Sequence, residues 1–227
     1  MKYAIFADIH SNLEALEAVL KDSKDQAVTH YACAGDIVGY GLNPKECLEI
    51  IREMGMPCVK GNHDEYCSAE SDLSIFNRIA AEGVDWTRQQ LNPEDRAWLR
   101  SLPLVCTVAG FTIVHATLDG PQRWGYVFDR LAASASMSRQ LTNICFFGHT
   151  HDPCAFILDK VVRGGSYTKF TVDRGSKYFI NPGAVGQPRD GNPKASYCIY
   201  DMEANTIELR RVGYNTPNCG PALAVVR

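Results

Sequence analysis

Short apolar runs that alternate with amphipathic segments constrain the fold of this chain more than any other feature of its sequence. In the first half, residues 2–7, 31–34 and 57–59 form apolar runs with the length of buried strands. The segments between these runs repeat their apolar residues at helical spacing. Because parallel strands need a long crossover connection, this alternation predicts parallel strands with helices packed outside them.

Local signals predict where the helices of the first half begin and end. Ser11 opens an S-x-x-E capping box, which predicts a helix start at that residue. Asn43 and Asn92 each precede a proline, and both pairs predict a helix with proline at its first position. Gly55 is expected to end the first of these two helices. A helical period of apolar residues from position 73 to 83 predicts one more helix.

The second half of the chain is richer in β-forming runs separated by glycine and aspartate turns. We expect strands at residues 104–108, 111–115, 144–147, 155–158, 167–172, 178–180, 195–200 and 206–211. A helix is expected over residues 129–141. No linker or repeat interrupts the chain, so the patterns predict one domain over residues 1–227. In that domain a βαβ half precedes a mostly antiparallel half, and two sheets pack together.

The composition excludes several classes of protein. Hydrophobic residues make up 45% of the 227 residues and charged residues 22%, a balance that excludes a disordered chain. No apolar run exceeds five residues, whereas a membrane-spanning helix needs about twenty. The 23 Lys and Arg against 26 Asp and Glu give a net charge of −3, which disfavours sequence-independent binding of nucleic acid.

The cysteines are scattered and give no sign of a metal ribbon or a redox motif. There are nine of them, and no two have C-x-x-C spacing. With no apparent export signal at the N-terminus, we expect reduced thiols, mostly in the core, and a cytoplasmic location.

Five polar motifs each follow one of the apolar runs. In chain order these are Asp8-Ile9-His10, Gly35-Asp36, Gly61-Asn62-His63-Asp64, the single His115, and Gly148-His149-Thr150-His151. Ligand sites of α/β sheets lie at the carboxyl ends of the strands, so the five motifs are expected to meet. Either D-x-H or G-H-x-H alone would be weak evidence, but five in succession indicate a metal site. His30 lies outside every motif and is expected to be structural or exposed.

The motifs together supply donors for more than one metal ion. Asp8, His10, Asp36, Asn62, His115, His149 and His151 offer oxygen and imidazole ligands and no thiolate. Such a set suits Mn, and also Fe, Zn, Ni or Co. Seven ligands match two divalent ions that share one carboxylate, an arrangement suited to phosphoryl transfer.

Spacing within the motifs supports the same interpretation. If the loops are extended, residues two apart point the same way, so Asp8 and His10 would reach one ion together. His149 and His151 would reach towards the pair of ions in the same manner. The glycines before Asp36, Asn62 and His149 would let the backbone pass close to the ions.

The motifs, in this order, resemble the signature of the calcineurin-like metallophosphoesterase superfamily. Residues 35–41, GDIVGYG, and 181–189, NPGAVGQPR, further resemble its compact bacterial and archaeal phosphodiesterase-like branch. The resemblance implies an α/β fold, a four-layer α/β/β/α sandwich of two mixed β-sheets flanked by helices. It also implies a metal-dependent phosphoric ester hydrolase, in which a hydroxide that bridges two metal ions attacks phosphorus in line.

The resemblance also implies a role for each motif residue. One ion would be held by Asp8, His10, Asp36 and His151, and the other by Asp36, Asn62, His115 and His149. Asp36 would therefore bridge the two ions. His63 would bind neither, and would act as general acid to the leaving group or as a donor to the phosphoryl group. The alternative for His63 is a structural histidine held by Asp64.

Two further residues bear on the substrate. Tyr40, between two glycines, stands where protein phosphatases of this superfamily have Arg, so a bidentate phosphate clamp is missing. Tyr40 would instead leave room for a second ester group. Arg189 would bind phosphate, the alternative being an exposed loop arginine.

These observations predict a phosphodiesterase that acts on a small phosphoester, with no role for a membrane and little for nucleic acid. The alternatives are a phosphomonoesterase, a dinucleoside polyphosphate hydrolase and a protein phosphatase. A nuclease would want a basic groove, and a non-catalytic scaffold of the same fold would be expected to lack some of these ligands. The sequence leaves open whether the chain forms a homo-oligomer.

Overall fold

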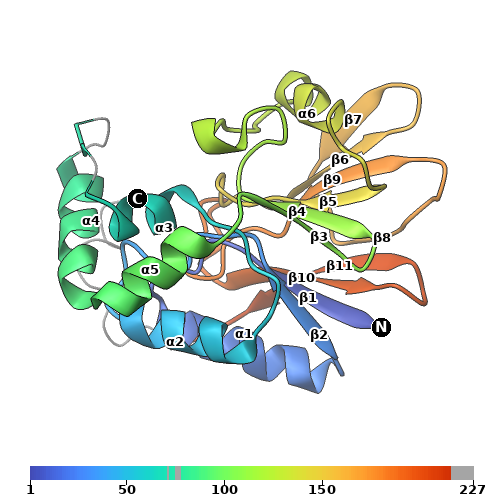
Figure 1. Ribbon diagram of the computed structural model, residues 1–227. Coiled ribbons are helices and arrows are strands. Elements are labelled where there is room, and N and C mark those ends of the chain that lie inside the picture. The colour runs from blue at the N-terminus through green and yellow to red at the C-terminus, as the bar shows by residue number, and fades with distance from the viewer. Residues whose placement is uncertain (71, 75–77, 216–227) are drawn as a thin grey trace.

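Two β-sheets packed face to face, with helices on their outer sides, make up the computed structural model in Figure 1. The structure describes residues 1–70, 72–74 and 78–215. Both sheets are mixed, as the predicted sandwich requires.

The first sheet joins strands from both ends of the chain. Its order is β2 (His30–Cys33), β1 (Lys2–Phe6), β10 (Ala195–Asp201), β11 (Thr206–Val212) and β8 (Lys169–Thr171). Only β1 and β2 are parallel, and the other neighbours are antiparallel. The expectation of two successive halves is therefore wrong, because late strands complete the sheet that the first strands begin.

The second sheet is built from the middle of the chain. Its order is β3 (Val105–Val108), β4 (Phe111–Val114), β5 (Ile144–Phe146), β9 (Lys177–Asn181), β6 (Cys154–Leu158) and β7 (Val162–Gly165). Strands β4, β5 and β9 are parallel, which places the carboxyl ends of β4 and β5 at one edge. The hairpin of β3 and β4 matches its prediction.

The helices cover the outer faces and one end of the sandwich. They are α1 (Leu13–Asp25), α2 (Pro44–Met54), α3 (Asn62–Ser68), α4 (Arg78–Gln90), α5 (Pro93–Ser101) and α6 (Arg130–Met137), with a short 3₁₀ turn, η1 (Pro121–Arg123). Helix α1 packs on β10 and β11, and α6 packs on β6, β7 and β9. Figure 1 shows α3, α4 and α5 gathered at the end of the sheets opposite the N-terminus.

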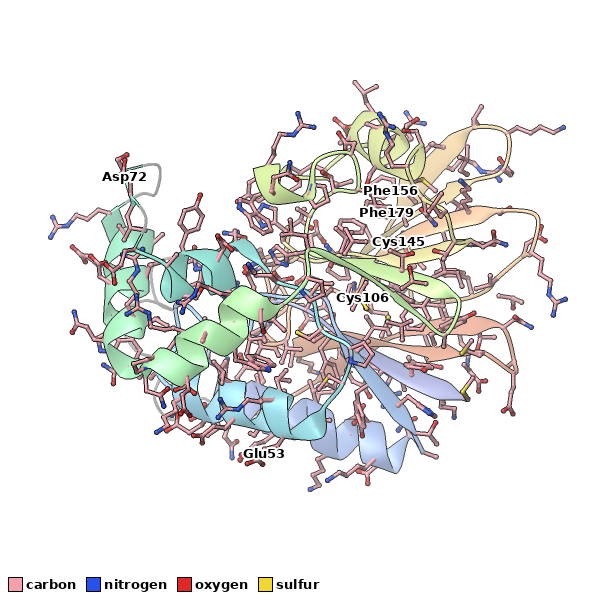
Figure 2. The ribbon with its side chains drawn as sticks, in the orientation of Figure 1. Glu53, Asp72, Cys106, Cys145, Phe156 and Phe179 are labelled. Carbon is pink, nitrogen blue, oxygen red and sulfur yellow. The ribbon has the colours of Figure 1, made fainter. Side chains whose placement is uncertain are left out.

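Three apolar clusters separate four layers, which confirms the α/β/β/α arrangement. The middle cluster lies between the sheets and includes Ile5, Ile113 and Phe146. A second cluster, with Leu16 and Leu48, lies under α1 and α2. The third joins α6 to the second sheet through side chains that include Cys145, Phe156 and Phe179, labelled in Figure 2. None of the helices in the described ranges combines the length and apolar character needed to cross a bilayer.

Local start and stop signals are mostly confirmed. Pro44 and Pro93 begin α2 and α5, and Gly55 ends α2 in the left-handed conformation. The capping box at Ser11 is wrong, because the side chain of Asn12 caps α1 instead.

Other boundaries differ from expectation. Residues 57–59 form only an isolated bridge to β2, and helix α6 ends four residues early. The helix expected from position 73 begins at Arg78, and residues 75–77 lie outside the described ones. The eight described cysteines are free thiols, six of them buried.

Candidate metal centre

The five predicted motifs meet at the carboxyl ends of β1, β2, β4 and β5. The donor atoms form two buried groups, each within 4.8 Å, which are Asp8, His10, Asp36 and His151, and then Asp36, His115 and His149. Asp36 belongs to both groups. Asn62 joins the second through its Oδ1 atom, 3.1 Å from His115 Nε2. His30, by contrast, is exposed on β2.

The carboxylate of Asp36 lies between the two groups. Its Oδ2 atom is 3.5 Å from His10 Nε2 and 3.3 Å from His115 Nε2. Its Oδ1 atom accepts a hydrogen bond of 2.8 Å from the backbone N–H of His63. One carboxylate oxygen therefore faces imidazoles of both groups, which is the placement that a bridging ligand requires.

Each histidine of the two groups has one ring nitrogen against a backbone carbonyl. The pairs are His10 Nδ1 with Val38 O at 3.2 Å, His115 Nδ1 with Ala34 O at 2.8 Å, His149 Nε2 with Trp124 O at 2.9 Å, and His151 Nδ1 with Gln187 O at 2.6 Å. The nitrogen that donates to a carbonyl carries the proton. The opposite nitrogen is thereby turned towards the cluster, as in histidines that bind metals.

Two of these inward nitrogens face each other without a proton between them. His10 Nε2 and His151 Nε2 lie 3.1 Å apart, and both rings have their proton on Nδ1. Burial lowers the pKa of both histidines, so neither ring gains a second proton. Opposed lone pairs repel each other, and a shared cation would turn that repulsion into attraction. The donor set therefore fits a divalent metal ion.

The pKa shifts within the cluster also fit the binding of a cation. Burial, with Asp36 nearby, raises the pKa of Asp8 to about 7. Burial also disfavours the charged form of Asp36, but His115 and His63 outweigh it and hold the pKa of that carboxyl well below its usual range. In return Asp36 overcomes the burial of His115 and raises its pKa to about 10. A cation bound by His115 Nε2 would thus displace a proton.

The ligands sit on turns, and the expectation of extended loops is wrong. Five of them have left-handed backbone conformations, namely Asp8 (φ 55°), His10 (47°), Asp36 (54°), His149 (69°) and His151 (60°). Each such residue costs roughly 1–2 kcal/mol relative to the ordinary helical region. The ligands converge because these turns aim them, and the two-residue alternation of a strand plays no part.

Glycines at positions 61 and 148 let these turns pack closely against the side chains of two ligands. A Cβ atom on Gly61 would overlap Asp36 Oδ1. A Cβ atom on Gly148 would lie 2.8 Å from Asp8 Oδ2, well inside van der Waals contact.

Asn62 and His63 lie in the first turn of α3 and do not belong to an extended loop. Successive helical side chains still diverge, so Asn62 contacts His115 while the ring of His63 packs 4.9 Å from that of His10. His63 is buried, and burial lowers its pKa.

Asp64 is a site residue whose role sequence reasoning missed. Its Oδ1 atom accepts hydrogen bonds from the backbone N–H groups of Ile37 and Val38, and its Oδ2 atom from those of Asp36 and Gly61. Asp64 therefore ties the loop after β2 to the start of α3. The available signal was the Gly-Asn-His-Asp motif, in which the glycine precedes α3 and the aspartate lies in its first turn.

Tyr40 and Arg189, the two residues predicted to bind substrate, lie beside the cluster. The Tyr40 ring packs 4.5 Å from that of His63 and 4.9 Å from that of His10. Burial raises the pKa of Tyr40, against the opposing charge of the nearby Arg189 guanidinium. Gln187, which the sequence did not single out, anchors Arg189 through a 2.8 Å hydrogen bond and also holds His151 through its carbonyl.

The family follows from the comparisons. The model of the calcineurin-like phosphoesterase superfamily domain matches residues 1–205, so this chain belongs to that superfamily. A metallophosphoesterase from Sphaerobacter thermophilus has a similar structure, with a TM-score of 0.82 and 38% identity over 95% of this chain and 89% of that one.

Among relatives in sequence, the uncharacterized protein MJ0912 of Methanocaldococcus jannaschii is 40% identical over 93% of this chain and 87% of its own. The phosphodiesterase YfcE of Escherichia coli K12 is 24% identical over 91% of both chains. A symmetrical bis(5′-nucleosyl)-tetraphosphatase of Aromatoleum aromaticum is 34% identical, over 37% of this chain and 32% of its own.

Proposed function

We propose that this protein is a phosphodiesterase that works with two divalent cations sharing the carboxylate of Asp36. The observation that carries the proposal is the pair of buried nitrogens, His10 Nε2 and His151 Nε2, which face each other at 3.1 Å. Metal coordination would use both lone pairs at once. Membership of a phosphoesterase superfamily supports the class of reaction, and likeness to a phosphodiesterase supports the diester substrate.

The two buried groups suggest which residues hold which cation. Asp8, His10, Asp36 and His151 would bind one, and Asp36, Asn62, His115 and His149 the other. Mn²⁺ is our first choice for this oxygen and imidazole set, with Fe, Zn, Ni or Co as alternatives. When bound, two such cations lower the pKa of water to near neutral and neutralise the phosphate oxygens.

His63 is proposed to act on the substrate directly. Its ring lies against His10 and Tyr40 at the edge of the donor cluster. Burial lowers the pKa of His63, and cations nearby would lower it further, so the ring is neutral at pH 7. A neutral imidazole supports the role of hydrogen-bond donor to the phosphoryl group over that of general acid.

The residues beside the donor cluster favour a phosphodiester substrate over a phosphomonoester. A monoester carries a second negative charge, which a clamp arginine at position 40 would neutralise. Tyr40 offers a protonated hydroxyl there, and the exposed Arg189 is the nearby cation that Gln187 orients. A diester has one charge fewer, so the cations and Arg189 can balance it.

The bridging role of Asp36 can be tested without an activity assay. Asp36→Asn should lower manganese below the two ions per chain expected for the wild type, because the amide supplies no charge to either cation. The stabilisation by Mn²⁺ in thermal unfolding should shrink with it. Glu53→Gln, an exposed carboxylate on α2 labelled in Figure 2, is the control. Two ions bound by Asp36→Asn at wild-type affinity would falsify the bridge.

The substrate class can be tested with model esters. The Mn-loaded enzyme should hydrolyse bis(p-nitrophenyl) phosphate with a higher kcat/KM than p-nitrophenyl phosphate. Tyr40→Arg should shift this ratio towards the monoester, since an arginine pair with phosphate is charge-assisted. Tyr40→Phe keeps the ring and should not. A wild-type preference for the monoester would refute the diester proposal.

Hydrolysis of a dinucleoside polyphosphate is the second candidate. The partial likeness to a bis(5′-nucleosyl)-tetraphosphatase, over 90 residues, favours it. The same Mn-loaded enzyme can be incubated with diadenosine tetraphosphate and the released nucleotides measured by chromatography. This experiment would decide between the two candidate functions.

A further inference from the structure

Two exposed aromatic rings continue outward from the metal centre. Tyr126 and Phe128 lie between η1 and α6, and their side chains are 50% and 70% exposed. The rings are nearly parallel, with an interplanar angle of 5° and centroids 5.3 Å apart. Tyr126 also stacks on His149, at 4.0 Å and 23°. A row of stacked rings therefore runs from a proposed metal ligand to the surface.

A pocket opens beside the outer ring. Its volume is about 430 Å³, and its wall includes Phe128, Thr150 and Asp152. Thr150 and Asp152 are the neighbours of His151 in the chain, so the pocket adjoins the loop that carries His149 and His151. Gly164 and Gly165 of the edge strand β7 also line the pocket, and they add no side chains to it.

The chemistry of this surface matches a nucleoside. A nucleobase has a flat face that stacks on an aromatic ring, and each stacked base contributes appreciably to binding. The volume lies in the range of small-ligand pockets. Polar side chains that line the pocket, among them Arg130, Thr150 and Asp152, offer donors and acceptors for ribose hydroxyls and base edges. A lipid chain would use none of these polar groups.

We propose that Phe128 and the pocket beside it bind the nucleoside of a phosphodiester whose phosphate lies at the metal centre. This rests on the proposed function and narrows its substrate class to nucleotide esters. The spacing between Phe128 and the metal centre suits a nucleotide, in which one sugar separates the base from the phosphate. In the protein one ring, that of Tyr126, separates Phe128 from the proposed metal ligand His149.

Two diesters with one leaving group test the proposal. The Mn-loaded protein should hydrolyse the p-nitrophenyl ester of thymidine 5′-phosphate at least about tenfold more efficiently than methyl p-nitrophenyl phosphate. Phe128→Ala should reduce kcat/KM on the nucleotide ester by about 5- to 150-fold, the effect of one stacked base. Its kcat/KM on the methyl ester should stay within about twofold. Phe128→Tyr keeps a ring and should retain the preference.

Leu131→Ala is the matched control, since Leu131 is 81% exposed on α6 and does not line the pocket. A wild-type ratio near one, or equal effects of Phe128→Ala and Leu131→Ala, would overturn the proposal.

If neither diester is hydrolysed, the proposed function fails and the pocket is judged by binding alone. Calorimetry should then show that thymidine 5′-monophosphate binds more tightly than methyl phosphate, and that only Phe128→Ala removes the difference. Equal affinities for the two ligands would reject the nucleoside site.

Discussion

Two residues that adjoin in sequence, His63 and Asp64, contribute to the site in different ways. His63 presents its ring beside the donor cluster, while its backbone N–H donates to Asp36. Asp64 accepts hydrogen bonds from four backbone N–H groups. The helical start of α3 separates the two side chains. Because its backbone does the anchoring, His63 can be changed without removing that contact.

His63→Ala should therefore keep the fold and the bound metal but lose about 10²- to 10³-fold in kcat, the effect of removing one preorganised hydrogen-bond donor. As a donor to the phosphoryl group, His63 should matter equally for substrates with good and poor leaving groups. Steady-state kinetics on a nitrophenyl diester and an alkyl diester, with metal content measured in parallel, check this. A loss confined to the alkyl diester would instead establish a general acid.

Among the helices and strands, the sequence predicted the boundaries that depend only on the local chain. Proline at the start of α2 and glycine at its end act on their own backbone, so both boundaries were correct. The short helix α3 was missed because its seven residues carry no apolar period. Strand β7, with two glycines and little burial, gave no strand pattern. The left-handed turns under the ligands depend on contacts between distant loops, which no local signal encodes.

Asp64→Asn tests the contact between two of these loops. The amide puts a donor where the carboxylate accepted, leaving buried backbone N–H groups unsatisfied at about 1–3 kcal/mol each. Urea unfolding of the chelator-treated protein should show a lower free energy of unfolding, by that amount for each unsatisfied group. Asp201→Asn is the control, because Asp201 accepts two backbone hydrogen bonds at an exposed turn. Equal losses for the two variants would mean that Asp64 has no special anchoring role.

At the scale of the molecule, the buried charges make stability without metal depend on pH. The pKa of Asp8 is raised to about 7 and that of Asp64 to about 6, both by burial first. A carboxyl whose folded pKa exceeds its unfolded value stabilises the fold at low pH, and loses that contribution as pH rises through the folded value. His115, raised to about 10 by Asp36 against its burial, acts in the same direction above pH 6.5.

Burial lowers the pKa of four other histidines, so their contribution to stability grows as pH rises and is complete above about pH 6.5; these are His10, His63, His149 and His151. The Tm of the chelated protein should therefore fall between about pH 7 and 9, where Asp8 and His115 still lose their contributions. The gain in Tm on adding Mn²⁺ should grow over the same interval, because the cation replaces the protons that are lost. Asp8→Asn should flatten the fall near pH 7, as it removes a group that titrates there. Differential scanning calorimetry at fixed ionic strength checks both. A chelated protein whose Tm rises over that interval would contradict the charges assigned to this cluster.

The pairing of β1 with β10 also bears on how the chain assembles during synthesis. Lys2 and Asp201 are partners in the ladder, so β1 pairs on this edge with a strand that is made much later. The donor cluster likewise spans Asp8 to His151. Contacts so distant in sequence slow folding, because the connecting chain must be ordered before they form. During synthesis β1 can pair early with β2, whereas its other edge and Asp8 must wait for β10 and His151, which are made much later.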